Sequence, residues 1–342
     1  MYPKISEIRT ELQKFDEYYR SRGGGTATYF GIDTGTHRYL CRIGYQSNLY
    51  PFISPSLLQA IALRPTIENC TRVPRLFDYV PRMTKIELQF SSITPPDLVV
   101  RKGRTKLFWF DEETVYTLGG PRISEEVENR RLLPEELPVP KIVEYDKEYP
   151  YYAEELIRGT HPTRSLEEWD TFERVFRELY ILYDEFSGEL LDVDEFIAEC
   201  ESHQLKNRTL EAIDDYGVPK YLPVTRVHAD LAHKNIILSD GMPYILDWER
   251  SRKEMLISDF FHLIIDICRG RNSTGTIADM ILEQGNAYQI LQRYLKIVSP
   301  LLEEYESGVP LLYFLYRVSR VDHPQESKYY EILDSLLYRL GY

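Results

Sequence analysis

The chain has 342 residues, 43% of them hydrophobic and 13% aromatic, so it can bury a substantial core in one large two-lobed domain or in two domains. Its formal net charge of −13 argues against a nucleic-acid partner, because an acidic surface repels phosphates. The four dispersed cysteines exclude a disulfide scaffold or a cysteine-based zinc site as the first interpretation. We expect no signal peptide and no membrane span, and therefore a cytoplasmic protein.

The first 96 residues are predicted to form an N-terminal extension or accessory region. Apolar residues at helical spacing over 5–19 predict a helix, which the glycines at 23–25 end. Two β-like runs follow, at 26–32 and 37–43. The glycine-rich stretch has neither the lysine of a P-loop nor the helix that follows one, so a helix stop and a hairpin are favoured over a phosphate loop.

Residues 97–159 are predicted to form a small β-rich lobe. Strands are expected over 98–100, 106–110 and 114–118, with Gly103 in the tight loop between the first two. A helix carrying several glutamates follows, and then two more strands. The remaining residues, 160–342, are predicted to form a large helical lobe. Its clearest signals are an apolar stripe from Trp169 to Leu182 and a helix beginning at Ser258, apolar almost all round.

The stretch from Arg226 to Glu249 carries the chemistry. Asp230 and Asn235 lie five residues apart, and the apolar run Ile-Ile-Leu that follows predicts a strand. A turn containing Asp-Gly leads to a second short strand, which ends at Asp247. If this hairpin forms, the three polar side chains converge at one edge. Carboxylate and amide oxygens are the ligands that Mg²⁺ prefers, and a further aspartate can orient an attacking hydroxyl.

The same stretch resembles the catalytic core of the aminoglycoside phosphotransferase and choline kinase-like superfamily, relatives of the protein kinases. The shared motifs are His-Ala-Asp-Leu with its following asparagine, and Ile-Leu-Asp-Trp-Glu. The resemblance implies a bilobal α+β fold, with ATP and Mg²⁺ as cofactors. It makes Asp230 the catalytic base, with His228 as a structural residue of the catalytic loop, and makes Asn235 and Asp247 the metal ligands.

The resemblance covers about 97–290 and implies nucleotide contacts in the small lobe. Gly103 lies in the loop that would cover the ATP phosphates, with Lys106 nearby in the next strand. Glu126 is the candidate for the helix glutamate of the family, with Glu125 close behind, and a solvated helix face is the alternative for either residue. Glu154 and Leu156 fall in the segment where main-chain groups would bind the adenine edge.

Two further residues are assigned around the catalytic loop. The family places an aspartate at the start of the helix after the hairpin, where its carboxylate can bond the loop, and Asp259 matches that position. Helix capping by Ser258 or Asp259 is an alternative that coexists with this role. Lys234, inside the loop, is either a contact to phosphate or acceptor or a solvated lysine, and the sequence does not decide between these.

The chain departs from the family pattern in its third strand. That strand normally presents a lysine to the α- and β-phosphates, which pairs with the helix glutamate. The corresponding position is at or near Thr117, and no lysine lies in the strand. Lys102, Lys106 and Arg122 are the candidates to replace it. A missing cation at the phosphates is the strongest argument in the sequence for a weak or degenerate enzyme.

We therefore predict an ATP- and Mg²⁺-dependent phosphotransferase that moves the γ-phosphate to a hydroxyl of a small molecule, such as a sugar, an amino alcohol or an aminoglycoside-like compound. A small-molecule acceptor is favoured over a protein because Asp247 is followed by Trp-Glu rather than Phe-Gly. The alternative is a nucleotide-binding pseudokinase with a regulatory or scaffolding role. The sequence indicates neither the acceptor nor the oligomeric state.

Overall fold

A computed structural model of the chain describes residues 3–19, 24–33, 38–42, 83–102, 104–119, 122–163, 169–185, 189–199, 204–268, 274–282, 289, 291–294, 308–319 and 326–342. The chain divides into two compact units, 1–128 with 140–160, and 129–139 with 161–342. Each unit is described by itself. The three-part division predicted from the sequence, 1–96, 97–159 and 160–342, stays a prediction.

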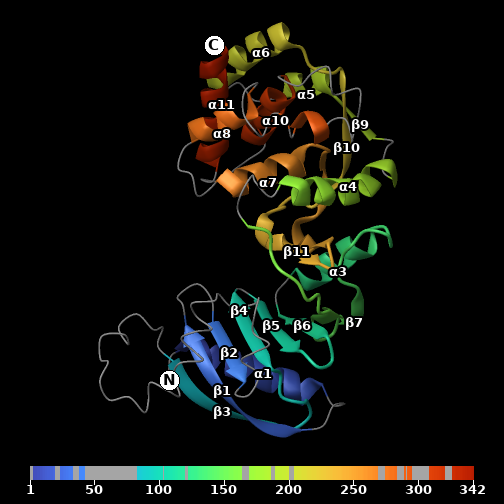
Figure 1. The fold of residues 1–342 in the computed structure, drawn as a ribbon, viewed down its shortest axis with the longest axis vertical. Helices are drawn as coiled ribbons and strands as arrows, with labels where there is room; N and C mark the ends of the chain where they lie inside the picture. The colour runs from blue at the N-terminus through green and yellow to red at the C-terminus, as the bar shows by residue number, and fades with distance from the viewer. Residues whose placement is uncertain are drawn as a thin grey trace, which may run out of the picture. The chain divides into compact units, whose positions relative to one another are not determined.

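The first unit is built on one eight-stranded sheet with the order β3-β1-β2-β4-β5-β6-β8-β7 (Figure 1). Every neighbouring pair in it is antiparallel. The strands are β1 (Gly25–Asp33), β2 (Arg38–Arg42), β3 (Met83–Phe90), β4 (Leu98–Lys102), β5 (Arg104–Trp109), β6 (Thr114–Leu118), β7 (Ile142–Asp146) and β8 (Tyr151–Glu155). The helix α3 (Ile123–Arg131) connects β6 to β7.

The N-terminal residues extend this sheet. Strand β2 pairs with β4, β1 pairs with β2, and β3 pairs with β1 at the edge. Helix α1 (Pro3–Tyr18) packs its apolar side against the sheet. Asp16 fixes the helix to the connection after β3, because its carboxylate accepts the backbone N–H groups of Ser91 at 2.7 Å and Ile93 at 2.8 Å. The helix and the first two strands predicted from the sequence are therefore present, and they belong to the same layered unit as the small lobe.

The second unit is mainly helical, with two small sheets. A three-stranded sheet has the order β13-β10-β9, and β11 pairs with β12 in a hairpin. Its strands are β9 (Glu189–Asp192), β10 (Tyr221–Val227), β11 (Ile236–Ser239), β12 (Met242–Ile245) and β13 (Arg252–Met255). Its helices are α4 (Trp169–Glu185), α5 (Val193–Glu199), α6 (Gln204–Tyr216), α7 (Ser258–Cys268), α8 (Thr274–Ile281), α10 (Gly308–Ser319) and α11 (Glu326–Leu340).

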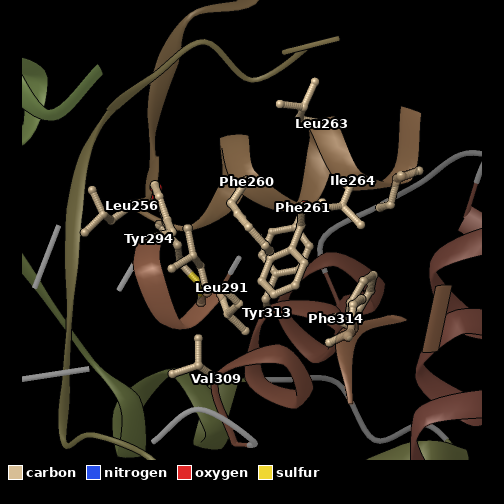
Figure 2. Close-up of a cluster of buried hydrophobic side chains, with 14 of the residues drawn as sticks. Leu256, Phe260, Phe261, Leu263, Ile264, Leu291, Tyr294, Val309, Tyr313 and Phe314 are labelled. Carbon is tan, nitrogen blue, oxygen red and sulfur yellow. The ribbon is translucent and has the colours of Figure 1, made fainter. Parts of the chain in front are cut away.

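The core of the second unit is centred on α7, which is buried along nearly its whole length. Aromatic side chains of α7 and α10 pack face to face: the rings of Phe261 and Tyr313 are stacked with centroids 4.5 Å apart (Figure 2). On the other side, Phe260 stacks on Tyr294 at 5.3 Å. The almost uniform apolar character of 258–268 in the sequence is therefore explained by packing on several sides.

Strands concentrate in the first unit and helices in the second, so the predicted α+β class is confirmed. No helix among the described residues is long and apolar enough to cross a membrane. The sequence analysis missed α6, although Leu205, Ala212 and Ile213 are buried at helical spacing. It also missed β10, whose sequence contains Pro223 and whose pairing partners lie far away in the chain.

Gly308, the first residue of α10, lies against the turn after α6. A Cβ atom there would lie 1.8 Å from the carbonyl oxygen of Gly217, and backbone cannot move aside as a flexible side chain does. We expect Gly308→Ala to lower the free energy of unfolding by about 2–3 kcal/mol, measured by urea denaturation. Gly341→Ala is the control: its φ is +94° with no atom within 4 Å, so it adds only about 1 kcal/mol of backbone strain. Equal losses in the two variants would contradict the clash.

Candidate active site

The loop that the resemblance identifies as the catalytic loop, His228 to Asn235, begins where β10 ends, and it leaves the strand through a strained residue. Ala229 has φ +63°, in the left-handed region that residues other than glycine, asparagine and aspartate rarely adopt. Such strain persists only where the surrounding structure holds it, and it gathers at functional sites. The turn separates buried His228 from half-buried Asp230.

His228 connects the loop to the end of the β11–β12 hairpin. Its Nδ1 accepts the N–H of Asp230 at 3.3 Å, so its Nε2 is the protonated nitrogen and donates to the carbonyl oxygen of Leu246 at 2.7 Å. The imidazole packs on the indole of Trp248 with ring centroids 4.8 Å apart. These contacts agree with the structural role that the resemblance implies for His228, which stays a prediction.

Asn235 makes the second connection. Its side-chain amide donates to the backbone carbonyl oxygen of Asp230 at 3.0 Å. The backbone carbonyl oxygen of Asn235 accepts the N–H of Leu246 at 2.8 Å. Asp247 is the next residue. Short hydrogen bonds within one unit thus hold Asp230 and Asn235 to the residue that precedes Asp247. That the three side chains meet at one metal ion stays a prediction.

The donor set of this loop fits a magnesium ion. The hydrogen bond from Nδ2 of Asn235 fixes the orientation of the amide and leaves its Oδ1 available as a metal ligand. Asp247 is exposed and has φ +67°, and within the described residues its carboxylate, like that of Asp230, has no hydrogen-bond or ion-pair partner. Hard oxygen donors with room for water and phosphate are what Mg²⁺ requires. Among the described residues no group of three or more His, Cys, Asp or Glu is arranged to hold a metal ion, so Asn235 and Asp247 differ from an all-protein metal cage.

Two aspartates of α7 hold the loop in place. The carboxylate of Asp259 accepts the N–H of His228 at 2.8 Å and the N–H of Ala229 at 2.9 Å. Burial raises the pKa of the Asp259 carboxyl, against the lowering effect of His228 and of these two backbone donors. Asp266 accepts from the backbone N–H of His233 at 3.1 Å and pairs with its Nδ1 at 2.5 Å.

The sequence analysis found Asp259 and missed Asp266. Asp259 lies at the start of the helix, where the family motif places an aspartate. Asp266 is a second carboxylate in this mostly apolar helix, seven residues after Asp259, which places it on the same side of the helix two turns later. That isolated polar residue was the available signal. Lys234 is exposed, and whether it contacts a ligand stays a prediction.

In the first unit, Glu126 is buried, with 2% of its surface exposed. Its carboxylate forms an ion pair with Arg104 of β5 and accepts a hydrogen bond from the hydroxyl of Tyr152 at 2.7 Å. Burial raises the pKa of Glu126, and the positive charges of Lys106 and Arg104 oppose that shift. The ammonium group of Lys106 lies 3.9 Å from Glu154. The structure therefore brings Lys106, Glu126 and Glu154 together.

The other predicted nucleotide contacts are less defined. The N–H of Leu156 donates to the carbonyl oxygen of Glu113 at 2.7 Å, so only the carbonyl group of Leu156 remains to contact an adenine. Gly103 lies outside the described residues. Thr117 stands in β6 at the position where the lysine is expected. It is fully buried, and its hydroxyl has no hydrogen-bond partner among the described residues.

Comparison with known proteins gives one family match. The model of the phosphotransferase enzyme family matches residues 120–294. Among solved structures, the choline kinase LicA from Streptococcus pneumoniae is 15% identical, with a TM-score of 0.43, over 70% of this chain and 91% of its own. The macrolide 2'-phosphotransferase MphH from Brachybacterium faecium is 16% identical, with a TM-score of 0.40, over 68% and 88%. The aminoglycoside phosphotransferase APH(2'')-Ib is 17% identical, with a TM-score of 0.40, over 70% and 91%. No curated protein matches the chain.

Proposed function

The chain belongs to the phosphotransferase enzyme family, and we propose that it transfers the γ-phosphate of ATP, in the presence of Mg²⁺, to a hydroxyl group of a small molecule. The enzyme class predicted from the sequence, a kinase with an alcohol group as acceptor, is confirmed by that membership. The observation that carries the rest is the arrangement of Asp230, Asn235 and Asp247 by hydrogen bonds through one loop and one hairpin.

Each residue has a defined task in the proposed reaction. Asn235 and Asp247 would hold the metal ion, which neutralises charge on the phosphates when it is bound. Asp230, with an unpartnered carboxylate, orients the acceptor hydroxyl and accepts its proton. The acceptor oxygen bonds to the γ-phosphorus as the bond from that phosphorus to the leaving oxygen breaks, and ADP leaves. Positioning and charge neutralisation supply most of the catalysis in such a transfer.

The acceptor is proposed to be a small molecule. The solved structures that resemble this chain include kinases of choline and ethanolamine and phosphotransferases of aminoglycosides and macrolides. Purified protein should therefore be assayed for ADP formation from ATP and Mg²⁺ with these four classes, together with sugars and nucleosides. Turnover that depends on one acceptor would support the proposal and name its class.

A pseudokinase remains the second candidate, because Thr117 stands where a lysine is expected. A pseudokinase would bind Mg²⁺ and nucleotide but would not consume ATP, whichever acceptor is added. The two candidates separate on one comparison. An enzyme shows acceptor-dependent ADP formation that point variants remove, whereas a pseudokinase shows nucleotide binding with no turnover for a variant to remove.

The metal assignment predicts the behaviour of Asp247→Asn. Asparagine tolerates the left-handed backbone at φ +67°, so the fold should persist while one negatively charged ligand is lost. We expect turnover to fall on the order of 10²-fold, and the Mg²⁺ concentration needed for half-maximal turnover to rise in the same assay. Asp240→Asn is the matched control, an exposed aspartate with φ +50° at the other end of β12. Equal activity in the two variants would contradict the metal role.

A further inference from the structure

The position in β6 where the family lysine is missing has a lysine directly beside it in the neighbouring strand. Lys106 of β5 pairs directly with Thr117 of β6, and Thr117 in turn pairs with Tyr152 of β8. Residues that pair directly across neighbouring strands point to the same face of a sheet. The ammonium group of Lys106 therefore starts one strand away, on the face where a lysine at position 117 would present its own.

Strand β5 presents a second positively charged side chain, Arg104, on the same face of the sheet. Arg104 is two residues before Lys106, so both side chains leave the same face of the strand. Arg104 forms the ion pair with the buried Glu126, whose other oxygen accepts the hydroxyl of Tyr152. A strand lysine of the family combines two tasks, pairing with the helix glutamate and contacting the phosphates. In this chain the first task is already performed by Arg104.

Lys106 is positioned for the other task. Its side chain is 40% exposed, whereas that of Arg104 is 18% exposed, so Lys106 is the member of the pair that a ligand can reach. Its contact to Glu154 is long, at 3.9 Å, and the positive charge of Lys106 also acts on Glu126. The flexible four-carbon stem of a lysine allows its ammonium group to turn towards a phosphate.

We propose that β5 replaces the missing lysine with two residues: Lys106 contacts the nucleotide phosphates, and Arg104 pairs with Glu126. This inference rests on the proposed function, since it assumes that the first unit binds ATP. It also explains why Thr117 can be accommodated in β6: the cation is displaced by one strand and divided between two side chains. The chain is then an active family member with a relocated phosphate contact.

The test compares nucleotides with and without phosphate, by isothermal titration calorimetry in the presence of Mg²⁺. Lys106→Thr should weaken ADP binding by about ten- to hundredfold and leave adenosine binding within a factor of two, because only ADP presents phosphates to the cation. Lys147→Thr, an exposed lysine in the turn between β7 and β8, is the matched control and should change neither affinity. The exchange variant Lys106→Thr with Thr117→Lys returns the lysine to β6, and we expect it to restore part of the ADP affinity.

The outcomes are distinguishable. If unaltered protein binds neither ADP nor adenosine, the proposed function fails. If it binds both and Lys106→Thr changes neither affinity, the relocated contact is wrong while the proposed function stands. If Lys106→Thr weakens ADP and adenosine equally, the residue supports the fold of the sheet rather than the phosphates, which also overturns the inference. A thermal unfolding measurement of each variant shows whether the fold is intact.

Discussion

Replacing Asp230 by asparagine should lower acceptor-dependent turnover by about 10³- to 10⁴-fold, the range that a positioned general base contributes. The physical reason is local. Within the described residues the carboxylate of Asp230 has no hydrogen-bond or ion-pair partner, so its negative charge is available to the acceptor hydroxyl. Asparagine keeps the shape of the side chain but cannot take up the proton.

The measurement is ADP formation with the acceptor that the panel identifies, accompanied by the affinity for ADP and Mg²⁺. We expect ADP affinity and the unfolding midpoint to be unchanged, because the backbone of Asp230, which bonds Asn235 and His228, is not altered. Asp214→Asn, an exposed aspartate of α6, is the matched control and should have full activity. Turnover within tenfold of the unaltered enzyme would show that Asp230 is not the base.

The second large effect concerns stability. Asp259→Ala should lower the free energy of unfolding by about 3–5 kcal/mol, because it leaves the N–H groups of His228 and Ala229 buried without an acceptor. Ala229 is also held at φ +63°, and the loss of its hydrogen bond removes part of what stabilises that backbone. Urea denaturation followed by circular dichroism measures the difference.

The control for Asp259 is another helical aspartate with a different environment. Asp279 of α8 is exposed and forms an ion pair with Arg339. Because exposed ion pairs contribute little, Asp279→Ala should cost at most about 1 kcal/mol. Similar losses in the two variants would mean that the loop finds other acceptors when Asp259 is absent. A large loss confined to Asp259→Ala would identify this carboxylate as a principal support of the catalytic loop.

The catalytic loop was predictable from sequence because its signals are local. Asp230, Asn235 and Asp247 lie within eighteen residues, and the turn and apolar strands between them determine where they meet. The fold class came from the resemblance that these motifs carry, while period-2 and helical spacing predicted many of the individual strands and helices. These predictions needed no knowledge of distant partners.

The pairings that the sequence did not reveal are those between distant segments. Arg104 and Glu126 are 22 residues apart, and His233 and Asp266 are 33 apart. Nothing in the local pattern around Arg104 distinguishes an ion pair with a buried carboxylate from an ordinary exposed arginine. Sheet register decides that Lys106 lies beside Thr117, and register depends on how the strands meet in three dimensions.

Helix α7 has a consequence for how this enzyme loses activity. Asp259 and Asp266 hold the beginning and the middle of the catalytic loop from one helix, and that helix is also the centre of the hydrophobic core. The loop therefore cannot open locally without disturbing the most protected part of the second unit. Its reactive geometry and the native core should disappear in one cooperative transition, so thermal inactivation and global unfolding of this unit should have the same midpoint. A protein arranged in this way has little opportunity to persist as a folded but catalytically disordered species.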